Sequence, residues 1–176
     1  MHFFILGFFT GLSLILAIGA QNVFVIEQGL KKEHIFIVCF ICALSDAFLI
    51  FLGIFLFFYF ANLITQTVEI ILNILLILFL IFFIWKKFKE KIHDQIFNTT
   101  KENKSLLSTI FKTLGFTFIN PHVYSDTVFF LGNFSKDFLI NQKFFFSAGA
   151  SLSSFVFFFT IGYLSRYLSQ YLKNAN

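Results

Sequence analysis

Long apolar segments are the feature that most constrains the fold of this chain. Five of them, at about residues 3–26, 35–60, 63–85, 106–131 and 144–164, can each form a helix that crosses a bilayer, which takes about 20 residues. A segment surrounded by lipid satisfies its backbone hydrogen-bonding groups only internally, so each is expected to be helical. The sequence therefore predicts an all-α, polytopic helical membrane bundle, residues 1–176 forming a single membrane domain with five transmembrane helices.

Composition and charge agree with a bilayer environment. Hydrophobic residues make up 58% of the chain and charged residues 12%, whereas soluble domains carry roughly 25% charged residues. The net charge of +4 does not indicate a nucleic-acid partner, because the basic residues lie in short connections between the apolar segments.

The distribution of Lys and Arg predicts the orientation in the membrane. If the five segments alternate in direction, ten basic residues share one side with the polar loop at 86–105, and two lie on the other side. The first side is expected to face the cytoplasm, which places the N-terminus outside. The ten are Lys31, Lys32, Lys86, Lys87, Lys89, Lys91, Lys101, Lys104, Arg166 and Lys173, and the two are Lys136 and Lys143; Lys112 lies just inside the fourth segment.

Asp46 lies near the middle of the second apolar segment, where no Lys or Arg accompanies it. Placing a charged side chain at the centre of a bilayer costs about 2.5–3.5 kcal/mol on insertion scales. One interpretation is a structural carboxylate that is hydrogen-bonded to a neighbouring span. The favoured interpretation is a functional site that binds a proton or a cation.

Two amide-bearing breaks interrupt other apolar segments. Gly19, Gln21 and Asn22 lie late in the first segment, either as a solvated helix end or as an unwound stretch that lines a cavity. In the fourth segment, Asn120 fits an N-cap, and Pro121 fits the first position of a new half-helix.

The residues after Pro121 could complete a polar site. The positive end of a half-helix that begins there would suit a carboxylate. His122 and Asp126 are four residues apart and therefore share a helix face, and Tyr124 belongs to the same polar stretch. The alternative is a simple proline kink. The two breaks are separated by an odd number of spans, which would give the two halves of an internal repeat opposite topologies.

Other features indicate packing rather than chemistry. Gly7 and Gly11, together with a small-residue stretch in the fifth segment, favour close helix packing, and the Gly7/Gly11 face could also pair with a second copy in a homodimer. Cys39 and Cys42 are interpreted as buried thiols rather than a redox or metal pair. No nucleophile–base pair or metal cluster indicates an enzyme, and no cofactor or metal is expected. The small-residue stretch contains Ser147, Gly149, Ala150, Ser151, Ser153 and Ser154.

The same segments resemble the lysine/arginine exporter family of bacteria (LysE/ArgO type). The stretches that carry the resemblance are AIGAQNVFVIEQGL at 17–30, CALSDAFLIFLGI at 42–54, FINPHVYSDTVFFLG at 118–132 and SAGASLSSFVFFFTIGYLSR at 147–166. They follow the family's order along nearly the whole chain. Family members usually have a sixth apolar segment after these, whereas this chain ends at Asn176 after the polar stretch SQYLKNAN.

The resemblance implies a multi-pass transporter that exports a basic L-amino acid across the inner membrane. It places Asp46 and Asp126 on the family's functional aspartates, and Asn22, Asn120 and Pro121 on its helix breaks. The expected partners are a cationic amino acid, protons and the lipid bilayer. Two alternatives stay open at this point: an exporter of another amino acid or small solute, and a membrane assembly or sensor protein that transports nothing.

Overall fold

The computed structural model describes residues 1–17, 19–59, 70–71, 74, 77–78, 81 and 105–173. Every regular element in this part of the chain is helical. The predicted third span at 63–85 lies largely outside the described residues, and so does nearly all of the polar loop at 86–105.

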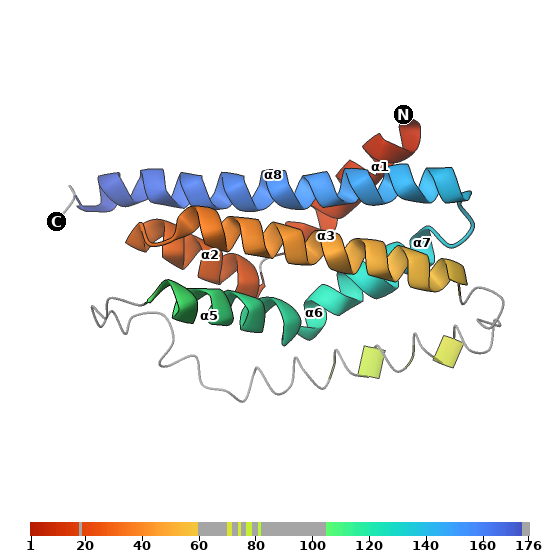
Figure 1. The fold of residues 1–176 in the computed structure, drawn as a ribbon, viewed down its shortest axis with the longest axis horizontal. Coiled ribbons are helices and arrows are strands. Elements are labelled where there is room, and N and C mark those ends of the chain that lie inside the picture. Colours follow the sequence, from red (N-terminus) through yellow and green to blue (C-terminus); the bar gives the residue numbers. More distant parts are fainter. Residues whose placement is uncertain are drawn as a thin grey trace.

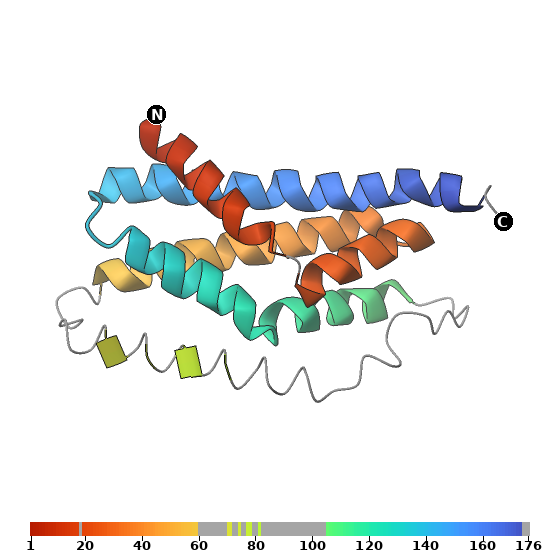
Figure 2. The same ribbon diagram turned by 180° about the vertical axis from the view of Figure 1, so that it is seen from behind.

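Two long helices, α3 (Ile35–Tyr59) and α8 (Ile140–Lys173), lie side by side in opposite directions along the molecule (Figures 1 and 2). Both are long and apolar enough to cross a membrane, α8 over Ile140–Gln170. Their contact buries Cys39 and Phe158, and the Cys39 thiol donates to the Phe158 carbonyl at 3.2 Å. The two cysteines are free and buried, as predicted.

The helix that contains the predicted fifth span, at 144–164, extends beyond that span at both ends. Helix α8 begins at Ile140 and continues to Lys173, through residues expected to form a polar tail. Ser165 and Ser169 are buried there, and their hydroxyls donate to the carbonyls of Ile161 and Arg166 on the same helix. The boundary differs because hydropathy indicates where lipid contact ends, whereas the helical backbone continues past that point.

The first and fourth apolar segments are each broken into shorter helices. The first contains α1 (His2–Ile15) and α2 (Ala20–Lys31), which are bent by 81° relative to each other and make a third candidate span if counted as one. The fourth begins with α5 (Leu106–Phe118) and continues after Asn120 as α6 (Pro121–Tyr124), the π-helix η1 (Ser125–Phe130) and α7 (Leu131–Phe134).

Helix α1 crosses α8 at a contact that only small residues permit (Figure 2). A Cβ added to Gly7 would collide with the Phe146 carbonyl, and one added to Gly149 would collide with the Phe4 carbonyl. The prediction that Gly7 and Gly149 serve packing is therefore confirmed. The face that carries Gly7 and Gly11 is already covered by α8 within the chain, so the expected pairing of that face with a second copy is not supported.

The glycine contact predicts a stability difference between two equivalent substitutions. Gly149→Ala should lower the free energy of unfolding by about 1–3 kcal/mol, because the added methyl group overpacks against α1. Gly115→Ala on α5 is the matched control, since its Cβ would meet only the Ile119 side chain at 3.9 Å. That change should be neutral or stabilising by up to about 1 kcal/mol, because alanine favours a helix over glycine. Thermal unfolding in detergent measures both, and equal stability of the two variants would contradict the packing argument.

Candidate functional site

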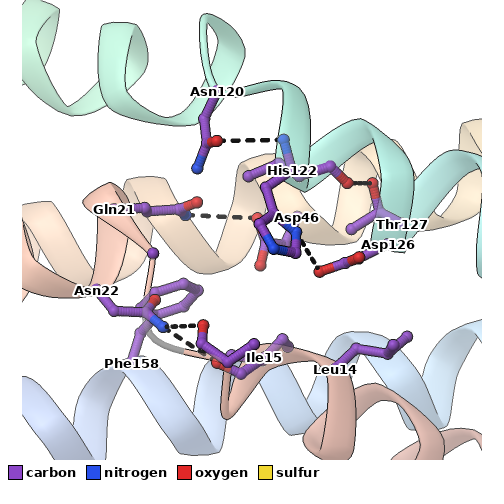
Figure 3. A pocket seen from close by; sticks show the side chains of 13 residues that line it. Leu14, Ile15, Gln21, Asn22, Asp46, Asn120, His122, Asp126, Thr127 and Phe158 are labelled. Atoms are coloured by element: carbon purple, nitrogen blue, oxygen red, sulfur yellow. Dashed lines mark hydrogen bonds and ion pairs between the residues drawn. The ribbon is translucent and has the colours of Figure 1, made fainter. Parts of the chain in front are cut away.

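The two helix breaks meet at one pocket between α2, α3, the α5–α6 turn, η1 and α8. Figure 3 shows Gln21 and Asn22 from the first break and Asn120 and His122 from the second, converging beside Asp46. A Cβ on Gly19 would lie 3.7 Å from Asn120 Nδ2, so the two breaks are in near contact. The pocket holds about 400 Å³ of empty space, counting its open mouth. Its lining consists of Leu14, Ile15, Ala17, Gly19, Gln21, Asn22, Asp46, Asn120, His122, Val123, Asp126, Thr127 and Phe158.

Asn22 holds the first break together. Its side-chain nitrogen donates to the carbonyls of Ile15 and Ala17, both at 3.1 Å, so it satisfies carbonyl groups that the end of α1 leaves free. Gly19 is extended (φ −107°, ψ 178°) at the N-cap of α2, and no side chain caps that helix. The two interpretations left open for this stretch therefore combine: it is a helix end, and it also lines a cavity.

The second break is capped as the sequence predicted. Asn120 Oδ1 accepts a hydrogen bond from the backbone N–H of His122 at 3.2 Å. The two residues flank Pro121, the first residue of α6. The Tyr124 hydroxyl donates to the carbonyl of Phe118, the last residue of α5, at 2.9 Å. These two contacts fix the angle between α5 and α6. Asn120 Nδ2 is left facing Gly19 and the pocket (Figure 3).

Asp46 is the deepest charged group of the site and is only 4% exposed. Gln21 Nε2 donates to its Oδ1 at 3.4 Å, and the Ser154 hydroxyl donates to its Oδ2 at 3.5 Å. Both contacts are long for hydrogen bonds and therefore weak. Among the described residues, no Lys or Arg forms an ion pair with this carboxylate.

Asp126 lies nearer the mouth and is paired. Its Oδ2 is 3.1 Å from His122 Nδ1, and the two side chains are 23% and 51% exposed, respectively. Asp126 belongs to the π-helix, which the sequence did not predict. A π-helical turn shifts the register of the residues after it, and such turns are frequent at functional sites. Here the π-helix packs against α3, where Gly53 admits the backbone of Val128.

Six of the eight residues singled out from the sequence line this pocket: Gln21, Asn22, Asp46, Asn120, His122 and Asp126. The other two, Pro121 and Tyr124, belong to helix α6 at the second break. Sequence analysis missed Phe158 and Thr127 in the lining and assigned Ser154 to packing alone. Serines in an apolar helix gave no signal that separated a carboxylate partner from a packing residue.

The pocket combines groups that recognise opposite charges. The N-terminus of α2 carries partial positive charge, while Asp46 and Asp126 carry carboxylates. A zwitterionic molecule with an additional cation matches this arrangement. Within the described residues, no group of three or more His, Cys, Asp or Glu side chains could hold a metal ion.

Comparison with known proteins gives consistent matches over almost the whole chain. The protein named "Putative amino-acid transporter YggA" from Aeromonas salmonicida is 34% identical over 174 residues, covering 96% of this chain and 82% of the relative. Proteins named "Arginine exporter protein ArgO" are similar too. The one from Pectobacterium carotovorum subsp. carotovorum (strain PC1) is 32% identical and covers 97% of this chain and 84% of the relative. The one from Serratia proteamaculans (strain 568) is 31% identical and covers 97% and 83%.

No solved structure matches the chain. The sequence model of the LysE type translocator family matches residues 12–176. Together with the similarity to these relatives and the apolar, membrane-length helices, this match shows a multi-pass membrane protein that belongs to the LysE type translocator family.

Proposed function

We propose that this protein exports a basic L-amino acid, arginine or lysine, across the bacterial inner membrane in exchange for protons. The observation that carries the proposal is Asp46, a buried carboxylate on the pocket wall that lacks a Lys or Arg partner among the described residues. An ionised group is rarely kept inside a membrane without a functional role or a partner. Membership of the family and the names of the arginine-exporting relatives support the same reading.

The α-carboxylate of the substrate is assigned to the first helix break. Helix α2 begins beside the pocket at Ala20, and its first turn receives no side-chain cap. Free backbone N–H groups and the helix dipole make such an end favourable for an anion. Asn120 Nδ2 faces the same place from the second break and can add a hydrogen bond. The second break is a poorer site, because the Asn120 side chain already caps His122 there.

The cationic side chain of the substrate is assigned to the carboxylates. Asp46 offers both oxygens with weak competition from Gln21 and Ser154, and Asp126 lines the same pocket from η1. A guanidinium group binds a carboxylate through two parallel hydrogen bonds, which favours arginine especially.

Export of a cation requires coupling to another ion movement. Moving one positive charge outward against an inside-negative potential costs about 2.3 kcal/mol per 100 mV. Import of one proton for each exported substrate cation cancels that charge movement. A pocket in which proton and substrate compete for the same charged groups, opened alternately to each side of the membrane, provides the exchange.

Asp46→Asn should abolish most arginine export. The amide keeps the size of the side chain but removes the charge, and a hydrogen bond to a charged group contributes about 1.5–3 kcal/mol, or roughly ten- to a hundredfold in binding. Efflux of radiolabelled arginine from loaded cells measures the effect at equal protein level. Glu27→Gln is the matched control, because Glu27 pairs with Lys31 on the surface of α2, away from the pocket. Export by Asp46→Asn at the rate of the Glu27→Gln variant would overturn the assignment.

Two arginine analogues test the two ends of the proposed site separately. Citrulline keeps the shape of arginine but has a neutral side chain, and agmatine lacks the α-carboxylate. Both should compete at least about tenfold more weakly than arginine in counterflow into proteoliposomes, because each loses one charged contact. Lysine should compete well. Equal competition by citrulline would exclude the basic substrate class, and equal competition by agmatine would exclude the role of the α2 N-terminus.

A further inference from the structure

His122 pairs with Asp126, one of the two carboxylates that are proposed to bind the substrate. Its Nδ1 is 3.1 Å from Asp126 Oδ2. Asp46, the second carboxylate, has no such partner among the described residues. The pair lies at the mouth, with His122 51% and Asp126 23% exposed, whereas Asp46 is deeper in the pocket.

Arginine and lysine carry two cationic groups each, the α-ammonium and the side-chain cation. The pocket offers two carboxylates, from α3 and η1. Asp126 can offer both of its carboxylate oxygens to a substrate cation only if Oδ2 gives up its contact with His122. An imidazolium left beside two substrate cations would then be repelled, because like charges at short range disfavour the charged form of a titratable group.

We propose that His122 is the proton carrier of the exchange, its imidazolium standing in for a substrate cation at Asp126 until the substrate displaces it. This inference rests on the proposed function and identifies the coupling residue. On the inner side, the substrate takes Asp126, and His122 Nδ1 loses its proton to water. On the outer side, the substrate leaves, His122 takes up a proton, and the pair with Asp126 forms again. One proton enters for each substrate molecule that leaves.

The surroundings of His122 suit a group that must gain and lose a proton. Its side chain is half exposed and lines the open pocket, which gives protons a route to it. Its backbone is held by the Asn120 cap, so the imidazole can move without unwinding α6. The titratable groups in the pocket lining besides His122 are Asp126 on η1 and Asp46 on α3, and both are acidic. The side chains that face the pocket from α2 and α8, Gln21, Asn22 and Phe158, are neutral. Histidine is the side chain whose charge ordinarily changes between pH 5 and 8.

The test is a count of the protons released when arginine binds. Calorimetric titration of the full chain in detergent at pH 6, in buffers of different ionisation enthalpy, gives that number. The wild-type protein should release close to one proton per arginine, so its Kd should fall by up to about tenfold per pH unit as the pH rises. His122→Gln, which stays neutral, should release few protons and bind arginine with little pH dependence between pH 5.5 and 7.5. His122→Asn should behave in the same way.

His2→Gln is the matched control, because His2 is an exposed residue at the start of α1, far from the lining of the pocket. It should release as many protons as the wild-type protein. Undiminished release by both His122 variants, with wild-type arginine binding intact, would assign the proton to Asp46 and overturn the role of His122 alone. Absence of arginine binding by the wild-type protein would overturn the proposed function, and the His122 inference with it. Thermal unfolding checks that the variants are folded. We expect unfolding temperatures close to that of the wild-type protein, because the His122 side chain is half exposed and contributes little to the core.

Discussion

A helix that stops inside a membrane leaves backbone groups that lipid cannot hydrogen-bond, and the rest of this structure depends on how those groups are satisfied. Asn22 reaches back to two carbonyls at the end of α1, while Asn120 caps the start of α6 and Tyr124 holds the end of α5. These contacts satisfy backbone groups at both breaks. The breaks in turn make room for a pocket beside the contact of the two long helices.

The two breaks offer different groups to a ligand. The N-cap of α2 is Gly19, which has no side chain, so the beginning of α2 remains uncapped and free for a ligand. The oxygen of Asn120 is used on His122, which leaves only its nitrogen for a ligand. The donors that remain for a ligand are therefore the backbone N–H groups at the start of α2 and Asn120 Nδ2, which faces the nearby Gly19. Asp46 and Asp126 provide the acceptors, and the resulting polarity suits a molecule with separated charges.

Polar residues in apolar segments predicted most of this site. Asp46, the Gln21-Asn22 pair and the Asn120-Pro121 break were identified because each is costly in lipid or incompatible with a continuous helix. The π-helix around Asp126 was not predicted, because its register depends on how η1 packs against Gly53 rather than on local residue preferences. Ser154 was assigned to packing, because a serine can satisfy itself on its own helix and shows no cost in the sequence.

The glycine contacts indicate which parts would move together in alternating access. Gly7 and Gly149 allow α1 to pack closely on α8, while Gly53 and Gly132 allow η1 and α7 to pack closely on α3. Each long helix therefore carries one piece of the opposite broken segment. The contact between the two long helices includes Cys39 of α3, which donates to the Phe158 carbonyl and packs against Gly162 of α8, and the pocket lies beside this contact. Rocking at the contact between α3 and α8 would open the pocket to either side while both glycine contacts stay closed.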